Sequence, residues 1–235
     1  MKTTLPRLHR LLAIQSLVVI LVSVNRLSTL TLGYLAPNEF LRWVDFLNMI
    51  PLPLISLVGF YLVKKEIEAS GQTQGLGAHL GLNLAFLIGV YLLGVSYGAH
   101  EITNYLHGRF CAEGGSRLCE IVAFQDDEFS HWVFFTGFVL VNASLLFLQT
   151  LFPYPQRPAR RDRAALIGNG LFIGLGIFAN LAFEQIGLDL YVVALLAGLA
   201  VVLHRRYGPQ PLVLYYLTAY LVGLAATTIV KLLPA

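Results

Sequence analysis

Long apolar runs, separated by short polar clusters, cover most of this 235-residue chain. A bilayer core of about 30 Å takes about 20 residues of helix to cross, and seven of the runs reach or approach that length. Because the runs are continuous and do not alternate, they predict helices and exclude a membrane barrel. We expect an all-α polytopic membrane bundle with helices at about residues 11–34, 46–63, 76–107, 128–152, 165–187, 189–204 and 211–233.

Composition supports this fold class. Hydrophobic residues make up 57% of the chain and the mean hydropathy is +0.70, whereas soluble domains are roughly 45–50% apolar. We find no internal repeat and predict a single transmembrane domain over residues 1–235, with membrane lipids as its partners. The net charge of +3 calls for no nucleic-acid partner, since the basic loops account for it.

The basic residues predict the orientation of the helices. Loops rich in Lys and Arg stay on the cytoplasmic side of a membrane, so we expect a cytoplasmic N-terminus and an extracytoplasmic C-terminus in a plasma or inner membrane. Ten of the 13 acidic residues then fall toward the outer face, where they would attract cations. Eleven of the 16 basic residues lie in the inner segments: Lys2, Arg7, Arg10, Lys64, Lys65, Arg157, Arg160, Arg161, Arg163, Arg205 and Arg206.

Both cysteines lie in the loop between the third and fourth predicted helices. Cys111 and Cys119 are eight positions apart, with Gly114 and Gly115 between them. On the predicted topology this loop is extracytoplasmic, and disulfides persist in oxidising compartments. We therefore predict a disulfide between Cys111 and Cys119.

Polar side chains gather at the outer end of the third predicted helix. His100, Asn104 and His107 are spaced by four and three residues, so they line one helical face, and Glu101 lies at the edge of that face. The spacing differs from HExxH, the pattern that would mark a zinc site directly.

The fourth predicted helix begins with a matching cluster. Asp127 and His131 form an i,i+4 pair, and Glu128 with His131 forms an i,i+3 pair, which is half of the di-iron carboxylate pattern. Imidazole and carboxylate groups suit zinc, iron or manganese. We expect a divalent metal ion, with zinc preferred and iron as the alternative, held by His100, Glu101, His107, Asp127 and His131.

Further polar residues in the outer halves of the helices are candidates for binding a substrate. A charge at bilayer depth is costly and usually faces a partner or a cavity. Arg26 is such a charge, and we expect it to pair with Glu184 or with Asp45 and to bind an anionic part of a substrate. Asn104 and Glu184 complete the predicted substrate-binding set.

Three classes of function fit these features. The first is a metal-dependent hydrolase acting on a lipid or another membrane substrate, with Asp127 or Glu128 as the general base. The second is a redox protein that carries di-iron, copper or haem. The third is a transporter or a non-catalytic subunit of a membrane complex, and a homo-oligomer is also compatible with the sequence.

One short motif resembles a known group of membrane hydrolases. Ser96-x-x-x-His100, followed by an acid on the next helix, is similar to the seven-helix ceramidase and progestin-receptor group. That resemblance implies a hydrolase. The group also carries His-x-x-x-His on its last helix, whereas residues 211–233 of this chain contain no histidine.

Overall fold

The computed structural model describes residues 5–70, 75–111, 115–183 and 187–232. These residues form helices joined by short connections, and the pairing of Tyr34 with Arg42 is the only β-bridge among them. The elements are α1 (Leu5–Leu27), α2 (Trp43–Met49), α3 (Pro51–Glu68), α4 (Leu76–Phe110), α5 (Arg117–Ala123), the π-helix η1 (Phe124–Phe129), α6 (Ser130–Leu151), α7 (Arg160–Phe183), α8 (Gly187–Tyr207) and α9 (Pro211–Leu232).

Within the described residues, seven segments are long and apolar enough to cross a membrane, which confirms the predicted all-α polytopic bundle. Five of them contain one helix each, namely α1, α4, α7, α8 and α9. The second segment joins α2 to α3, and the fourth joins α5, η1 and α6. The chain is therefore an integral membrane protein.

The first helix lies earlier in the chain than predicted. It begins at Leu5 instead of about residue 11, and it ends at Leu27 instead of continuing to Tyr34. Near the end of α1, polar side chains form hydrogen bonds that compete with those of the helical backbone. The Thr31 hydroxyl donates to the Asn25 side chain at 2.5 Å, and Asn25 donates to the Val44 carbonyl at 3.1 Å. Asn and Thr side chains compete with helical bonds in this way. Residues 28–42 consequently fold as an irregular segment.

The second crossing is interrupted where two prolines occur. α2 ends at Met49, Ile50 has a non-helical backbone, and Pro51 is the first residue of α3. Proline lacks an amide hydrogen and suits the first turn of a helix, where that donor has no partner. The second crossing is therefore broken into two helices at Pro51.

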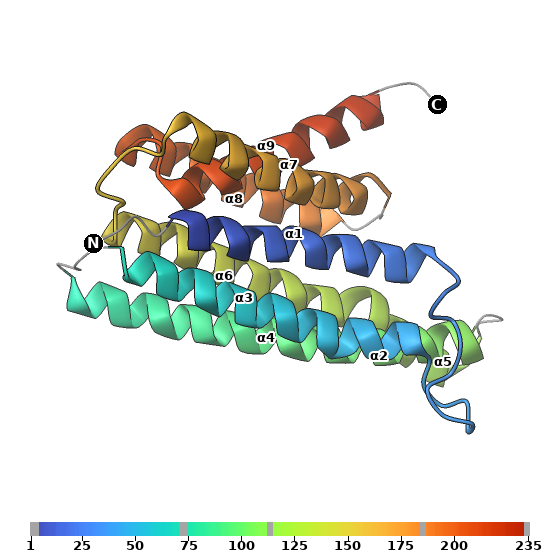
Figure 1. Ribbon diagram of the computed structural model, residues 1–235. Helices are drawn as coiled ribbons and strands as arrows, with labels where there is room; N and C mark the ends of the chain where they lie inside the picture. The colour runs from blue at the N-terminus through green and yellow to red at the C-terminus, as the bar shows by residue number, and fades with distance from the viewer. Residues whose placement is uncertain (1–4, 71–74, 112–114, 184–186, 233–235) are drawn as a thin grey trace.

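The helices pack in two groups, as Figure 1 shows. α1, α3, α4 and α6 lie beside one another, and α7, α8 and α9 form a second group against α1 and α6. α4 and α6 approach so closely that a Cβ atom added at Gly137 would lie 2.8 Å from the Gly89 carbonyl oxygen. Small residues permit such contact between membrane helices. This contact packs the middle of α4 against α6, and the C-terminal part of α4 contacts η1.

Candidate metal centre

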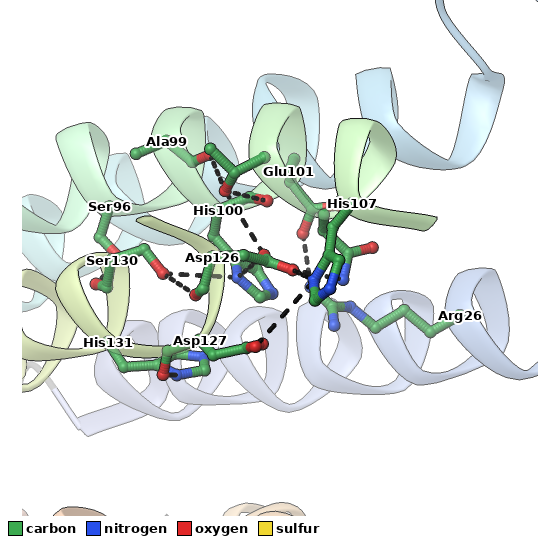
Figure 2. A network of polar contacts seen from close by, with 12 residues as sticks. Arg26, Ser96, Ala99, His100, Glu101, His107, Asp126, Asp127, Ser130 and His131 are labelled. Atoms are coloured by element: carbon green, nitrogen blue, oxygen red, sulfur yellow. Dashed lines mark hydrogen bonds and ion pairs between the residues drawn. The ribbon is translucent and has the colours of Figure 1, made fainter. Parts of the chain in front are cut away.

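Asp126 in η1 is the centre of the polar cluster, and its side chain is almost fully buried. One carboxylate oxygen lies 3.1 Å from His100 Nδ1 and the other 3.1 Å from His107 Nδ1. Thr103 and Asn104 donate to the same two oxygens at 3.4 and 3.5 Å. A buried carboxylate needs such partners to offset its loss of water. Figure 2 shows Asp126 between the two imidazoles.

Helical geometry explains how α4 supplies all four partners. Positions 100, 103, 104 and 107 recur every three or four residues, so they follow one another along a single face. The predicted grouping of His100, Asn104 and His107 is thus brought to one carboxylate. Thr103 belongs to the same face and was not among the predicted residues, because threonine alone carries little signal for a site.

The π-helix explains why Asp126 takes this position and Asp127 does not. α-Helical spacing counted back from His131 selects Asp127, but a π-helix closes its hydrogen bonds over one more residue per turn. The faces of η1 are therefore rotated relative to α6. Asp126 is buried, whereas the Asp127 side chain is 63% exposed and Glu128 is also exposed. No sequence pattern used above indicates a π-helix.

Three residues in this cluster lie close enough to one another to be candidate ligands of a metal ion. Single ligand atoms of His107, Asp126 and Asp127 all lie within 4.8 Å of one another. Zinc ligands stand about 2.0–2.2 Å from the ion, and hence about 3.3 Å apart in a tetrahedron. The 3.1 Å between His107 Nδ1 and Asp126 Oδ2 meets this spacing. Asp127 Oδ2 is 4.0 Å from the same nitrogen, on an exposed side chain that is free to approach.

His131 lies next to this group without joining it. Its Nδ1 is 2.8 Å from the Asp127 carbonyl oxygen, and its ring centroid is 5.0 Å from that of His100. The two imidazoles therefore lie next to each other at the edge of the cluster, with their ring planes tilted by 41°.

Two buried serines lie beside the cluster, between α4 and α6. The Ser130 hydroxyl donates to the Asp126 carbonyl at 2.5 Å, and the Ser96 hydroxyl donates to the Ser130 carbonyl at 2.8 Å. Ser130 Oγ also lies 3.5 Å from His100 Nδ1. Ser96, the serine of the hydrolase-like motif, thus ties α4 to α6 in this structure.

Glu101 points away from Asp126 and pairs with Arg26. Arg26 Nη2 donates to Glu101 Oε1, and the Glu101 side chain is buried while that of Arg26 is 44% exposed. Asp45 accepts two 2.8 Å bonds from Arg42 instead. This carboxylate raises the pKa of the Arg42 guanidinium above its ordinary value. Glu184, the other expected partner of Arg26, lies outside the described residues.

The predicted disulfide is present. Cys111 follows the last residue of α4, Cys119 lies in α5, and the two are bonded with their Cα atoms 5.4 Å apart. The bond fastens the C-terminal end of α4 to the short helix that leads into η1. It therefore lies next to the two elements that carry the cluster.

Comparison with known proteins adds no relative, since no family model, curated protein or solved structure matches this chain.

Proposed function

We propose that this protein is a membrane-embedded metal-dependent hydrolase that holds a divalent ion with His107, Asp126 and Asp127. The observation that carries the proposal is the convergence of these three ligand atoms within 4.8 Å where α4 meets η1, next to a disulfide between the end of α4 and α5. One nitrogen and two oxygens form a donor set that suits zinc, with iron as the alternative.

The surroundings of the three residues support a metal site. His100 and Thr103 hold the second oxygen of Asp126, so the carboxylate keeps one orientation. Partners of this kind orient metal ligands in proteins. Asp126 is buried and fixed, whereas Asp127 is exposed and able to close on an ion. A rigid pair and a mobile third ligand would allow an ion to enter from the exposed side.

The choice of a hydrolase follows from the number of ligands. When bound by three protein ligands, zinc polarises an ester and lowers the pKa of a water in its open position to about 7. Glu128 follows Asp127 directly and is exposed, so with Asp127 used as a ligand it is the carboxylate left to accept a proton. Since the cluster lies in a membrane-crossing segment, we propose a lipid as the substrate.

Elemental analysis of the purified full-length protein tests the proposal. We expect about one zinc or iron ion per chain in the wild type, and much less in His107→Ala and in Asp126→Asn. Glu120→Gln is the matched control, because it removes an exposed carboxylate that pairs with Arg117 on the neighbouring helix α5. Equal metal content in all four proteins would refute the metal site.

An absorption spectrum of the same samples separates the hydrolase from the redox alternative. Zinc is spectrally silent, whereas iron and copper in their oxidised states absorb visible light. A coloured wild type whose colour disappears in His107→Ala would contradict the hydrolase and favour redox chemistry at the same ligands.

A further inference from the structure

Arg26 is a cation at the end of a membrane-crossing helix, next to the proposed metal centre. Its guanidinium donates to Glu101, the residue that follows His100, and it lies within electrostatic range of the His100 imidazole. Figure 2 shows the Arg26 side chain reaching from α1 toward α4 below His107. The outer ends of α1 and α4 thus bring a positive charge to the edge of the cluster.

Most of the hydrogen-bond donors of the Arg26 guanidinium are not used by Glu101. A guanidinium has five N–H donors, and among the described residues Glu101 is the one partner of this side chain. Glu101 is buried and fixes the guanidinium, while the 44% exposure of Arg26 leaves its other donors accessible. An orientated, accessible guanidinium is well suited to bind an oxyanion through two parallel bonds.

The partner of Arg26 also lines an apolar cavity. A cavity of about 130 Å³ lies between α2, α4 and the irregular segment 28–42, and its wall consists of Glu101, Asp45 and Tyr105 together with Phe40, Leu41, Met49, Ile102 and Leu106. The cavity is mainly apolar and small, so it has room for only part of an acyl chain. An acyl chain in it would place its polar end near the Arg26–Glu101 pair.

We infer that the substrate of this site is an amphiphile with a phosphate-bearing headgroup, whose phosphate is bound by Arg26 and whose acyl chain enters the cavity beside Glu101. This inference rests on the proposed function, because it assigns the substrate of the same centre. Phosphate fits better than carboxylate, since it has enough oxygens to occupy the guanidinium and still present one toward the ion.

Binding measurements on the full-length protein in detergent test this assignment. The probes are 1-oleoyl lysophosphatidic acid, inorganic phosphate and 1-oleoylglycerol, each titrated into metal-loaded protein. We expect lysophosphatidic acid to bind more tightly than either of the other two. Arg26→Gln should weaken its binding by roughly tenfold or more, the loss expected for a hydrogen bond to a charged group.

Three further variants separate the parts of the inference. Arg26→Lys keeps the charge without the planar fork and should lose affinity by an intermediate factor. Leu106→Trp fills the cavity and should weaken lysophosphatidic acid while leaving inorganic phosphate unchanged. Arg117→Gln removes an exposed cation that pairs with Glu120 and should leave all three probes unchanged.

Three outcomes would overturn the inference. Equal binding of lysophosphatidic acid to the wild type and to Arg26→Gln would remove Arg26 from the site. Equal binding of 1-oleoylglycerol and lysophosphatidic acid to the wild type would exclude a phosphate headgroup. Binding of inorganic phosphate as tight as that of the lipid would make free phosphate the ligand.

Elemental analysis of the same samples distinguishes these failures from failure of the metal site. Metal bound with no effect of Arg26 contradicts only the substrate assignment. A wild type without metal contradicts the proposed function itself.

Discussion

His107 and Asp126 face each other between α4 and η1, with Nδ1 and Oδ2 3.1 Å apart. The two residues come from different elements of adjacent membrane crossings, 19 positions apart in the chain. Their contact joins the most buried acid of the cluster to an imidazole that is 34% exposed. A ligand pair of this kind connects the interior of the bundle with its surface.

Asp126→Asn and Asp127→Asn should separate stability from metal binding. Asp126 is buried with four partners, so its neutralisation should lower the free energy of unfolding by about 2–3 kcal/mol, the cost of losing hydrogen bonds to a charged group. Asp127 is exposed, and its substitution should change stability by less than about 0.5 kcal/mol. Both should lower metal affinity at least tenfold. Thermal unfolding and metal titration in detergent measure the two effects, and an Asp127→Asn protein with unchanged affinity would exclude that ligand.

Arg26 and Glu101 should be energetically coupled. Removing Arg26 alone leaves the buried Glu101 carboxylate without its ion-pair partner, which is costly. Removing both side chains leaves no unpaired buried charge. Because Arg26 is 44% exposed, solvent screens the pair, and we expect a coupling energy of only about 1 kcal/mol. A double-mutant cycle of Arg26→Gln and Glu101→Gln measures it. Strictly additive effects would show that the two side chains do not interact in solution.

Loss of the disulfide should loosen the C-terminal end of α4. The bond closes a small loop of eight positions, for which chain entropy predicts about 2.5 kcal/mol of stabilisation. Cys111→Ser with Cys119→Ser should unfold at a lower temperature and bind metal more weakly than the wild type. The wild type treated with reductant provides the matched comparison. Full retention of metal affinity in both would mean that the bond does not position the cluster.

Gly89→Ala and Gly94→Ala should differ although both lie in α4. A Cβ atom at Gly89 would lie 2.9 Å from the Leu140 Cβ atom and the Val141 backbone nitrogen, so alanine there forces α4 and α6 apart and should cost about 1–3 kcal/mol. Gly94 has open space around it, and alanine, as the better helix former, should be neutral or slightly stabilising. Thermal unfolding of the two variants measures the difference. Similar destabilisation of both would contradict the close contact.

Sequence reasoning succeeded where the controlling physics is local. Seven apolar runs predict seven crossings because the bilayer thickness and the need to satisfy every backbone group act on each run separately. The face of α4 that carries His100 and His107 follows from α-helical spacing in the same way. The pairing of Cys111 with Cys119 needed only the topology and a short separation.

Sequence reasoning was incomplete where distant segments or an unusual backbone decide the outcome. The partner of Arg26 is Glu101, 75 positions away, whereas the sequence analysis named Glu184 and Asp45. The central position of Asp126 in the cluster depends on the π-helical turn. That turn decides which of the consecutive acids Asp126, Asp127 and Glu128 points toward α4. The metal ion, its ligands and the orientation in the membrane stay predictions.

Because η1 winds with a wide π-helical turn, the acid that points inward depends on the number of residues in η1 as well as on their types. Removing one residue within Phe124–Phe129 would let this stretch wind as an ordinary α-helix and would turn everything before it by about 100°. A single-codon deletion there would therefore exchange the acid that meets the two imidazoles without altering any of the chemical groups involved. The length of this short segment, and not only its residue types, thus sets which acid faces α4.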